Sequence, residues 1–108
     1  MARTFDQEQL EQLAGDDRAF QKELLQLFVA DTDNSLSQLE TAISTDNPSA
    51  VQALAHYIKG ASANIGAVGM SRTAAQLERL AKTENLKPAP TSLRQLQILH
   101  EEVKRLAC

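Results

Sequence analysis

The chain has 108 residues, of which 43% are hydrophobic, 23% charged and 4% aromatic, and its net charge is −3. This length and composition predict one globular domain, residues 1–108, with a core of aliphatic rather than aromatic side chains. The weak negative charge argues against nucleic acid or an anionic membrane as partner, and the single cysteine, Cys108, excludes an internal disulfide.

The first predicted helix is short and runs from Phe5 and Asp6 through Leu13. Asp6 is a candidate N-cap, and Gln9, three residues later, can return the hydrogen bond in the capping-box manner. Gly15 ends the segment. Because its apolar edge is narrow, we expect this helix to cover one end of a larger assembly.

The second predicted helix is long, with Asp16 or Asp17 as its N-cap and its end near Thr45. The polar residues 31–35 could introduce a kink, but the apolar pattern resumes in phase after them, so we interpret the helix as continuous. The residues predicted to face the core are Phe20, Leu24, Leu27, Phe28, Leu36, Leu39 and Ile43.

The third predicted helix spans Pro48 to Ile65. Asp46 or Asn47 can cap it, and Pro48 falls in the first turn, where its missing N–H costs nothing. Gly66 suits a left-handed C-terminal cap. The predicted apolar face consists of Val51, Leu54, Ile58, Ser62 and Ile65.

Two further helices complete the chain. One covers about residues 70–83, with Met70, Ala74, Leu77, Leu80 and Ala81 inward. Pro88 and Pro90 predict a loop over 85–90, and Thr91 or Ser92 is the expected cap of the last helix. Its inward residues are predicted to be Leu93, Leu96, Leu99, Val103 and Leu106.

No segment shows the alternation typical of strands, so the fold class is all-α. Four amphipathic helices with short links predict an antiparallel up-and-down four-helix bundle with a short N-terminal capping helix. No run approaches the roughly 20 apolar residues of a membrane span, and no signal peptide opens the chain. We therefore expect a soluble, cytoplasmic protein.

His56 is the most reactive side chain of the third helix, and it lies off the apolar face. At about 100° per residue it is about 140° from Val51, and Gly60 is nearly opposite the apolar face. Glycine within a helix costs about 0.5–1 kcal/mol relative to alanine, which indicates that something large must approach the histidine. A neutral imidazole is a nucleophile, and Lys59 could meet the charge of an incoming phosphoryl group. Position alone also fits a solvated histidine beside an ordinary exposed lysine.

Residues 56–67, HYIKGASANIGA, resemble the signature of histidine phosphotransfer domains, in which His-x-x-Lys-Gly precedes small residues and a second glycine. The resemblance covers nearly the whole chain and includes the Phe5-Asp6 opening and the Leu77-Glu78 pair. Tyr57 departs from the pattern, because smaller or polar residues are common at this position in the family. It could pack at the edge of the helix or add to a docking surface.

The resemblance implies that His56 accepts a phosphoryl group from an aspartate of one receiver domain and passes it to an aspartate of another. The nucleophile would be the ring nitrogen farther from the backbone, Lys59 would assist electrostatically, and Gly60 would let the receiver approach. The implied partners of a monomeric chain are response-regulator receiver domains and a sensor histidine kinase. We expect no cofactor and no metal on this chain, and Mg²⁺ only on the receiver. Without a glycine-rich phosphate loop, we expect no autonomous kinase activity.

Glu78 is the second residue singled out by the resemblance. In relatives such as the histidine domain of chemotaxis kinases, a Glu or Gln on the next helix accepts the proton of the nearer ring nitrogen, and that position falls on Glu78. This contact would leave the farther nitrogen with a free lone pair. The alternative is a solvent-facing glutamate paired with Lys82 four residues later.

His100 lies near the edge of the apolar face of the last helix, and nothing like Lys-Gly follows it, so we interpret it as a boundary-packing residue. A zinc site from His56, His100 and carboxylates is weakly supported, because the ligand spacing is absent. A metal-dependent enzyme is therefore the least favoured alternative.

The predicted docking surface is the exposed face around His56. It consists of Gln52, Ala53, Lys59, Gly60, Ala63 and Asn64, with Ser71, Arg72, Ala75 and Arg79 on the next helix. Two alternatives stay open: a histidine-phosphorylated domain of a larger sensor or chemotaxis-type kinase, and a helical adaptor that binds receivers without transfer.

Overall fold

The computed structural model describes residues 4–108 and contains five helices and no strand in that part of the chain. The helices are α1 (Gln7–Ala14), α2 (Arg18–Ser44), α3 (Pro48–Ile65), α4 (Val68–Lys82) and α5 (Ala89–Ala107). The all-α prediction is therefore confirmed. Among these residues no helix combines the length and apolar character that a membrane crossing would require.

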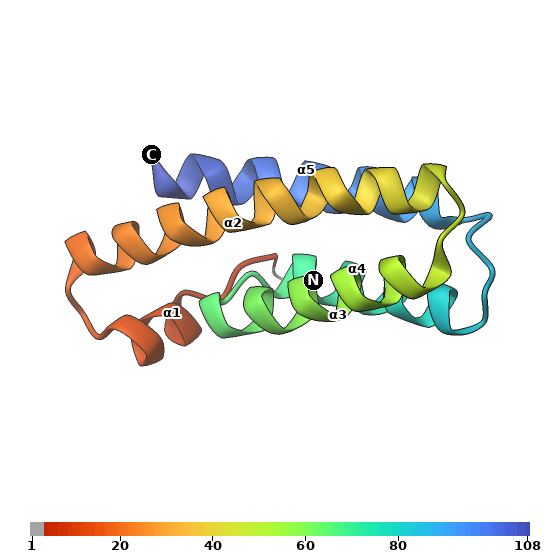
Figure 1. Ribbon diagram of the computed structural model, residues 1–108. Helices are drawn as coiled ribbons and strands as arrows, with labels where there is room; N and C mark the ends of the chain where they lie inside the picture. Colours follow the sequence, from red (N-terminus) through yellow and green to blue (C-terminus); the bar gives the residue numbers. More distant parts are fainter. Residues whose placement is uncertain (1–3) are drawn as a thin grey trace.

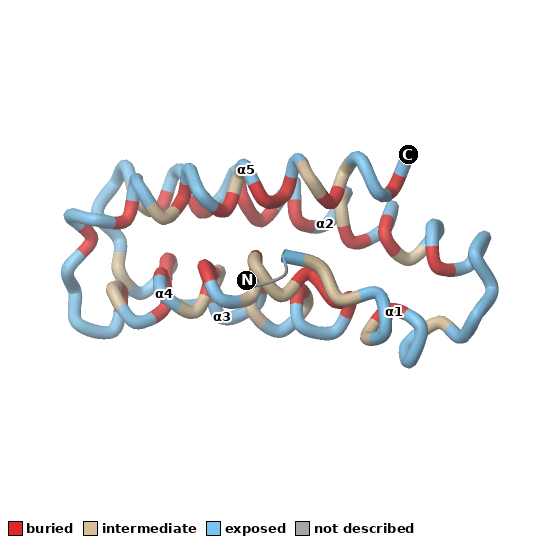
Figure 2. Tube along the Cα trace, turned by 180° about the vertical axis from the view of Figure 1, so that it is seen from behind, coloured by how far each residue is buried: buried red, intermediate tan, exposed pale blue. Residues whose placement is uncertain are grey.

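The four long helices form two layers, with α2 and α5 in one and α3 and α4 in the other (Figure 1). α3 packs against α4 and α2, and α5 packs against α2 and α4. The short α1 contacts only α3 and α2, at one end of the molecule. Buried residues line the inner side of each layer, as Figure 2 shows. The layer of α3 and α4 is the one that carries His56.

The buried face of α2 differs from the predicted one. Phe20 and Leu27 are 43% and 63% exposed, so their assignment to the core is wrong, and Leu24 is only half-buried. The buried face of α2 still follows three- and four-residue steps. It includes polar residues, which a prediction from apolar residues alone does not assign to the core. It consists of Gln21, Leu25, Phe28, Thr32, Ser35, Leu36, Leu39 and Ala42. The helix is continuous through residues 31–35, as predicted.

The caps of the first three helices largely match the prediction. Asp17 caps α2, Asn47 caps α3, and Gly66 ends α3 in the left-handed region with a φ of 94°. Asp6 caps α1, as predicted. The capping box predicted that the Asp6 N–H would donate to the Gln9 side chain, but it donates to the Gly66 carbonyl at 2.7 Å instead. A Cβ at Gly66 would lie 2.4 Å from the Asp6 carbonyl oxygen, so this crossing requires glycine.

α4 and α5 begin earlier than predicted. α4 starts at Val68 rather than near residue 70, and α5 starts at Ala89 rather than after Thr91 or Ser92. Neither helix has a side-chain cap, which removes the signal used to place its start. Pro88 is the N-cap residue of α5 and Pro90 lies in its first turn, where a helix needs no N–H donor. Leu106 is 50% exposed, so its inward placement is wrong, and the buried face ends on Val103 and Ala107.

Candidate functional site

His56 projects from α3 on the side away from the core. The buried residues of this helix are Val51, Ala55, Ile58, Ser62 and Ile65. They lie on one side of α3, and the His56 side chain, on the opposite side, is 69% exposed. The imidazole is therefore open to a macromolecular partner, while its helix is held firmly by the core.

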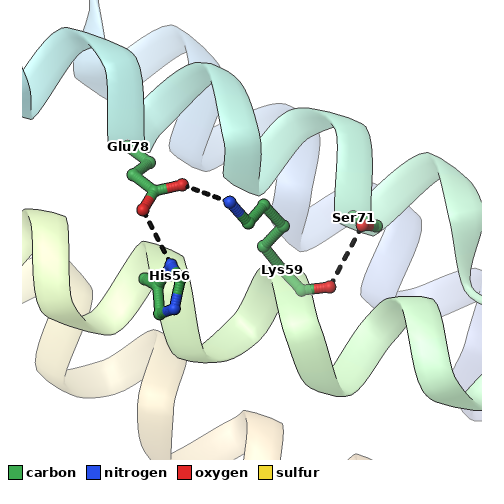
Figure 3. A network of polar contacts seen from close by, with 4 residues as sticks. All are labelled: His56, Lys59, Ser71 and Glu78. Carbon is green, nitrogen blue, oxygen red and sulfur yellow. Dashed lines mark hydrogen bonds and ion pairs between the residues drawn. The ribbon is translucent and has the colours of Figure 1, made fainter.

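Glu78 of α4 joins His56 and Lys59 in one network (Figure 3). Its Oε2 lies 2.8 Å from His56 Nδ1, and its Oε1 accepts from Lys59 Nζ at 2.6 Å. Ser71 of α4 adds a second connection, because its Oγ donates to the Lys59 carbonyl at 3.0 Å. Glu78 is only 6% exposed, so the solvent-facing alternative is wrong.

The charge of Glu78 determines how the histidine ring is protonated. The Lys59 ammonium lowers the pKa of the Glu78 carboxyl below its ordinary value, against the opposing effect of burial, and the hydrogen bond to His56 adds to the lowering. An ionised carboxylate can only accept hydrogen bonds, so Nδ1 of His56 donates its proton to Oε2. In the neutral ring Nε2 then carries the lone pair, and in Figure 3 this nitrogen points away from Glu78.

Gly60 lies one turn beyond His56 and is exposed. A Cβ placed there would meet no heavy atom within 4 Å, so a close helix contact does not explain the glycine. The position instead leaves the backbone of α3 bare beside the imidazole.

Several of the predicted docking residues do surround His56. A hollow of about 560 Å³ beside the imidazole is lined by Ser49, Gln52, Ala53, His56, Glu78 and Lys82. Ala63 and Asn64 are exposed farther along α3, and Ser71 and Ala75 are half-buried on α4. Sequence reasoning missed Ser49, and it considered Lys82 only as a partner of Glu78. Ser49 lies one helical turn before Gln52 and Ala53, and Lys82 lies one turn after Glu78. This helical spacing could have predicted that both residues border the site.

The structure does not bring Arg79 to the His56 face. Arg79 lines a different hollow together with Leu80, Thr83, Pro88 and Ser92, toward α5. Arg72 is two turns before Arg79 on α4 and so shares its face of the helix. Both arginines are exposed, and neither lines the hollow beside His56, so their place in the docking surface stays a prediction.

Tyr57 connects the site to α2. Its side chain is half-exposed, and its hydroxyl donates to Oδ2 of Asp31. No local sequence pattern predicts this pairing, because it depends on how α2 and α3 align. The exposed Leu27, one turn before Asp31 on α2, lies on the same side of its helix.

His100 is in different surroundings from His56. It is 2% exposed, so it is a core residue rather than the predicted boundary residue. Its Nε2 lies 2.8 Å from Oδ1 of Asp33, which also accepts from Lys104 Nζ at 3.1 Å. Burial would raise the pKa of Asp33, but the hydrogen bonds from His100 and Lys104 outweigh it and lower that pKa. Within residues 4–108 no group of three or more His, Cys, Asp or Glu side chains could hold a metal ion.

Comparison with known proteins agrees with the resemblance carried by residues 56–67. The family model described as "Hpt domain" matches residues 23–106. The crystal structure of histidine-containing phosphotransfer protein B (HptB) from Pseudomonas aeruginosa PAO1 is similar, with a TM-score of 0.91 and 29% sequence identity over 99% of this chain and 93% of that chain. No curated protein matches the sequence.

Proposed function

The chain belongs to the Hpt domain family, and on that premise we propose that it is a phosphoryl carrier in a multistep His–Asp phosphorelay. His56 would receive a phosphoryl group from the aspartate of one receiver domain and deliver it to the aspartate of another. The observation that carries this proposal is the pairing of an exposed imidazole with a buried carboxylate at its nearer nitrogen.

The transfer needs only the lone pair of Nε2. This nitrogen attacks the phosphorus of the aspartyl phosphate, an N–P bond forms, and the P–O bond breaks so that the aspartate leaves as a carboxylate. Nδ1 keeps its proton, so the phosphorylated ring gains positive charge. The Glu78 carboxylate, 2.8 Å from Nδ1, stabilises that charge. Delivery to the second receiver is the same step in reverse, with its aspartate as the nucleophile.

The receiver would dock on the exposed face of α3. Gly60 lets it approach the backbone, and the hollow bordered by Gln52 and Ala53 gives its phosphoaspartate access to His56. A transient complex buries roughly 800 Å² or less on each partner. Such a footprint reaches the neighbouring helices, whose axes are about 8–10 Å away. On that basis we include the α4 residues Ser71 and Ala75 in the surface.

We further infer that α2 to α5 form an antiparallel up-and-down four-helix bundle, with α1 covering one end. Successive helices reverse direction in Figure 1, and each long helix packs on two others. The domain would have no kinase activity of its own, and Mg²⁺ would be bound by the receiver. The expected partners are receiver domains and a sensor histidine kinase, with the chain itself a monomer.

The proposal is tested by incubating the protein with a radiolabelled, phosphorylated receiver and then adding a second, unlabelled receiver. We expect label to pass to the protein as an acid-labile, base-stable phosphate and then to the second receiver. His56→Gln should abolish both steps while the variant stays folded. Receiver binding without any phosphate uptake would contradict the carrier function and favour an adaptor.

A further inference from the structure

The segment ahead of α1 crosses the turn between α3 and α4 and is bonded to both sides of it. The Asp6 N–H donates to the Gly66 carbonyl at 2.7 Å, and the Gly69 N–H of α4 donates to the Thr4 carbonyl at 3.0 Å. Figure 1 shows this segment, in red, beside the turn. We infer that residues 4–6, the N-terminal strap, are a conformational device that closes over the α3–α4 turn and holds the first turn of α4 against α3.

The start of α4 depends on this strap for a hydrogen-bond acceptor. Its N-cap residue is Ala67, and the helix has no side-chain cap. The first N–H groups of an α-helix find no carbonyl partner within the helix itself. Gly69 is the second residue of α4, and the acceptor that its N–H reaches is the Thr4 carbonyl. The strap therefore does for α4 what the side chains of Asp17 and Asn47 do for α2 and α3.

The space beside Gly69 is occupied by the strap. A Cβ at this position would lie 3.3 Å from both Cα and Cβ of Thr4, which is tighter than ordinary van der Waals contact, and 3.4 Å from Cδ2 of Leu99. Among the described residues Gly69 is not one of those with a positive φ, so its backbone would accept alanine. Alanine is also favoured over glycine within a helix. The strap is therefore what favours glycine at position 69, whereas Gly60 has open space around it.

The strap can open without unfolding the core. Toward α1 it is held by Phe5, which packs against the core, and by Asp6, whose Oδ1 accepts from the Glu8 N–H at 3.1 Å. Thr4, which supplies the acceptor for α4, is exposed. Hydrogen bonds of exposed backbone open locally, at a smaller free energy than global unfolding requires. The bond from Gly69 to Thr4 is therefore the part of the strap that opens first.

The first turn of α4 links the strap to the site. Ser71 follows Gly69 by two residues, and its Oγ donates to the Lys59 carbonyl of α3 at 3.0 Å. This bond joins α4 to α3 next to Gly60, where the receiver would approach. A closed strap fixes the first turn of α4 and, with it, the Ser71 side of the docking surface. For its effect on transfer, the inference rests on the proposed function.

The first test measures amide hydrogen exchange by NMR in the unphosphorylated full chain. We expect the Gly69 N–H to exchange at least about tenfold more slowly than in an unstructured chain, because its bond to Thr4 must open first. Ala19 is the matched control: it is the second residue of α2, it is exposed, and its N–H has no acceptor among the described hydrogen bonds. Ala19 should exchange at close to the unstructured rate. Equal protection of the Gly69 and Ala19 amides would overturn the inference.

The second test displaces the strap with the methyl group of Gly69→Ala. We expect the Asp6 N–H, whose acceptor is Gly66, to exchange several-fold faster in this variant. Gly60→Ala is the same substitution where a Cβ meets nothing, so it should leave the exchange of Asp6 unchanged. Thr4→Gly removes the Cβ that the new methyl group would meet, so adding it to Gly69→Ala should restore part of the protection. Unchanged exchange of Asp6 in Gly69→Ala, with the fold intact by circular dichroism, would overturn the inference.

The link from the strap to the site is tested by phosphate uptake from a receiver. We expect Gly69→Ala to slow uptake about twofold to fivefold, through the coupling of packed elements, and the added Thr4→Gly to regain part of the rate. Uptake at the native rate in Gly69→Ala, when amide exchange shows that its strap is open, would overturn this link. If the native protein takes up no phosphate, the proposed function fails, and the exchange of Gly69 and Asp6 still decides whether the strap holds α4.

Discussion

The two ring nitrogens of His56 lie in different surroundings, and this difference defines the site. Nδ1 is bound to a buried carboxylate, while the side chain as a whole is 69% exposed. His100 has the opposite arrangement: the ring is buried, and its acidic partner, Asp33, is the half-exposed member of the pair. Of the two histidines in the described part of the chain, His56 is therefore the one whose ring is accessible to another protein.

Substitutions at Gly60 should change stability and phosphate uptake in opposite directions. A Cβ at this exposed helical position meets nothing within 4 Å, so Gly60→Ala should raise the free energy of unfolding by about 0.5–1 kcal/mol. The same methyl group, and more so the side chain of Gly60→Gln, should slow phosphate uptake by obstructing the receiver. Urea denaturation and uptake kinetics on the same samples check both effects. A loss of stability, or uptake unaffected by Gln, would count against the role assigned to Gly60.

The charge of Glu78 should make the free energy of unfolding depend on pH in the acid range. The folded pKa of Glu78 lies below its ordinary value of 4.5, so its ion pair contributes fully above that pH and is lost as the pH falls through the folded pKa. We expect the difference in unfolding free energy between the native protein and Glu78→Gln to stay constant near neutrality and to shrink below pH 4.5. Urea titrations over a pH series measure this difference, and Asp33 contributes equally to both proteins. If the unfolding free energies of the two proteins keep the same difference at acid pH, the ion pair of Glu78 does not contribute to stability.

At the level of elements, a polar cluster joins α2 to α5. The buried ring of His100 is bonded to Asp33 of α2, which also pairs with Lys104 of α5. The ring also packs edge-on against Phe28 of α2, with the two centroids 6.3 Å apart. The cluster lies in the layer opposite to the one that carries His56, so we assign it to stability.

Asp33→Ala should therefore destabilise the fold without affecting transfer. It leaves the buried Nε2 of His100 without its acceptor, which should lower the unfolding free energy by roughly 1–3 kcal/mol. Glu101→Ala is the matched control, because Glu101 also pairs with Lys104 but has no contact with His100 among the described hydrogen bonds. Equal losses in the two variants would show that the bond to His100 is not what stabilises this interface.

The helices that could be predicted closely are those with strong local signals. Pro48 and Gly66 fix the two ends of α3, and both were predicted to the residue. The starts of α4 and α5 were misplaced because neither has a capping side chain. The face of α2 was misjudged because Gln21 is buried, where its side chain donates to the Gly15 carbonyl and accepts from Gln7. Such tertiary hydrogen bonds make a polar residue a core residue without changing the local sequence pattern.

The same distinction applies to the site. The exposure of His56 follows from the periodicity of a single helix, so the sequence was sufficient to predict it. The contact between Glu78 and His56 depends on the packing register of two helices, which a local pattern does not determine. Local reasoning therefore could not choose between Lys82 and His56 as the partner of Glu78. The packing of α3 against α4 determines the partner.

For the molecule as a whole, the two layers have different roles: one carries the site and the other completes the core. α3 and α4 hold the imidazole, its carboxylate and the adjoining hollow, while α2 and α5 pack against them and complete the core. We propose that this arrangement exposes one reactive nitrogen, Nε2 of His56.

The most direct test is to phosphorylate the protein with a phosphorylated receiver and to identify the N–P bond by phosphorus and ring-nitrogen NMR. We expect a single phosphohistidine, at His56, with phosphorus on Nε2 and the proton still on Nδ1. Phosphorus on Nδ1 of His56, on His100 or on any other residue would contradict the claim.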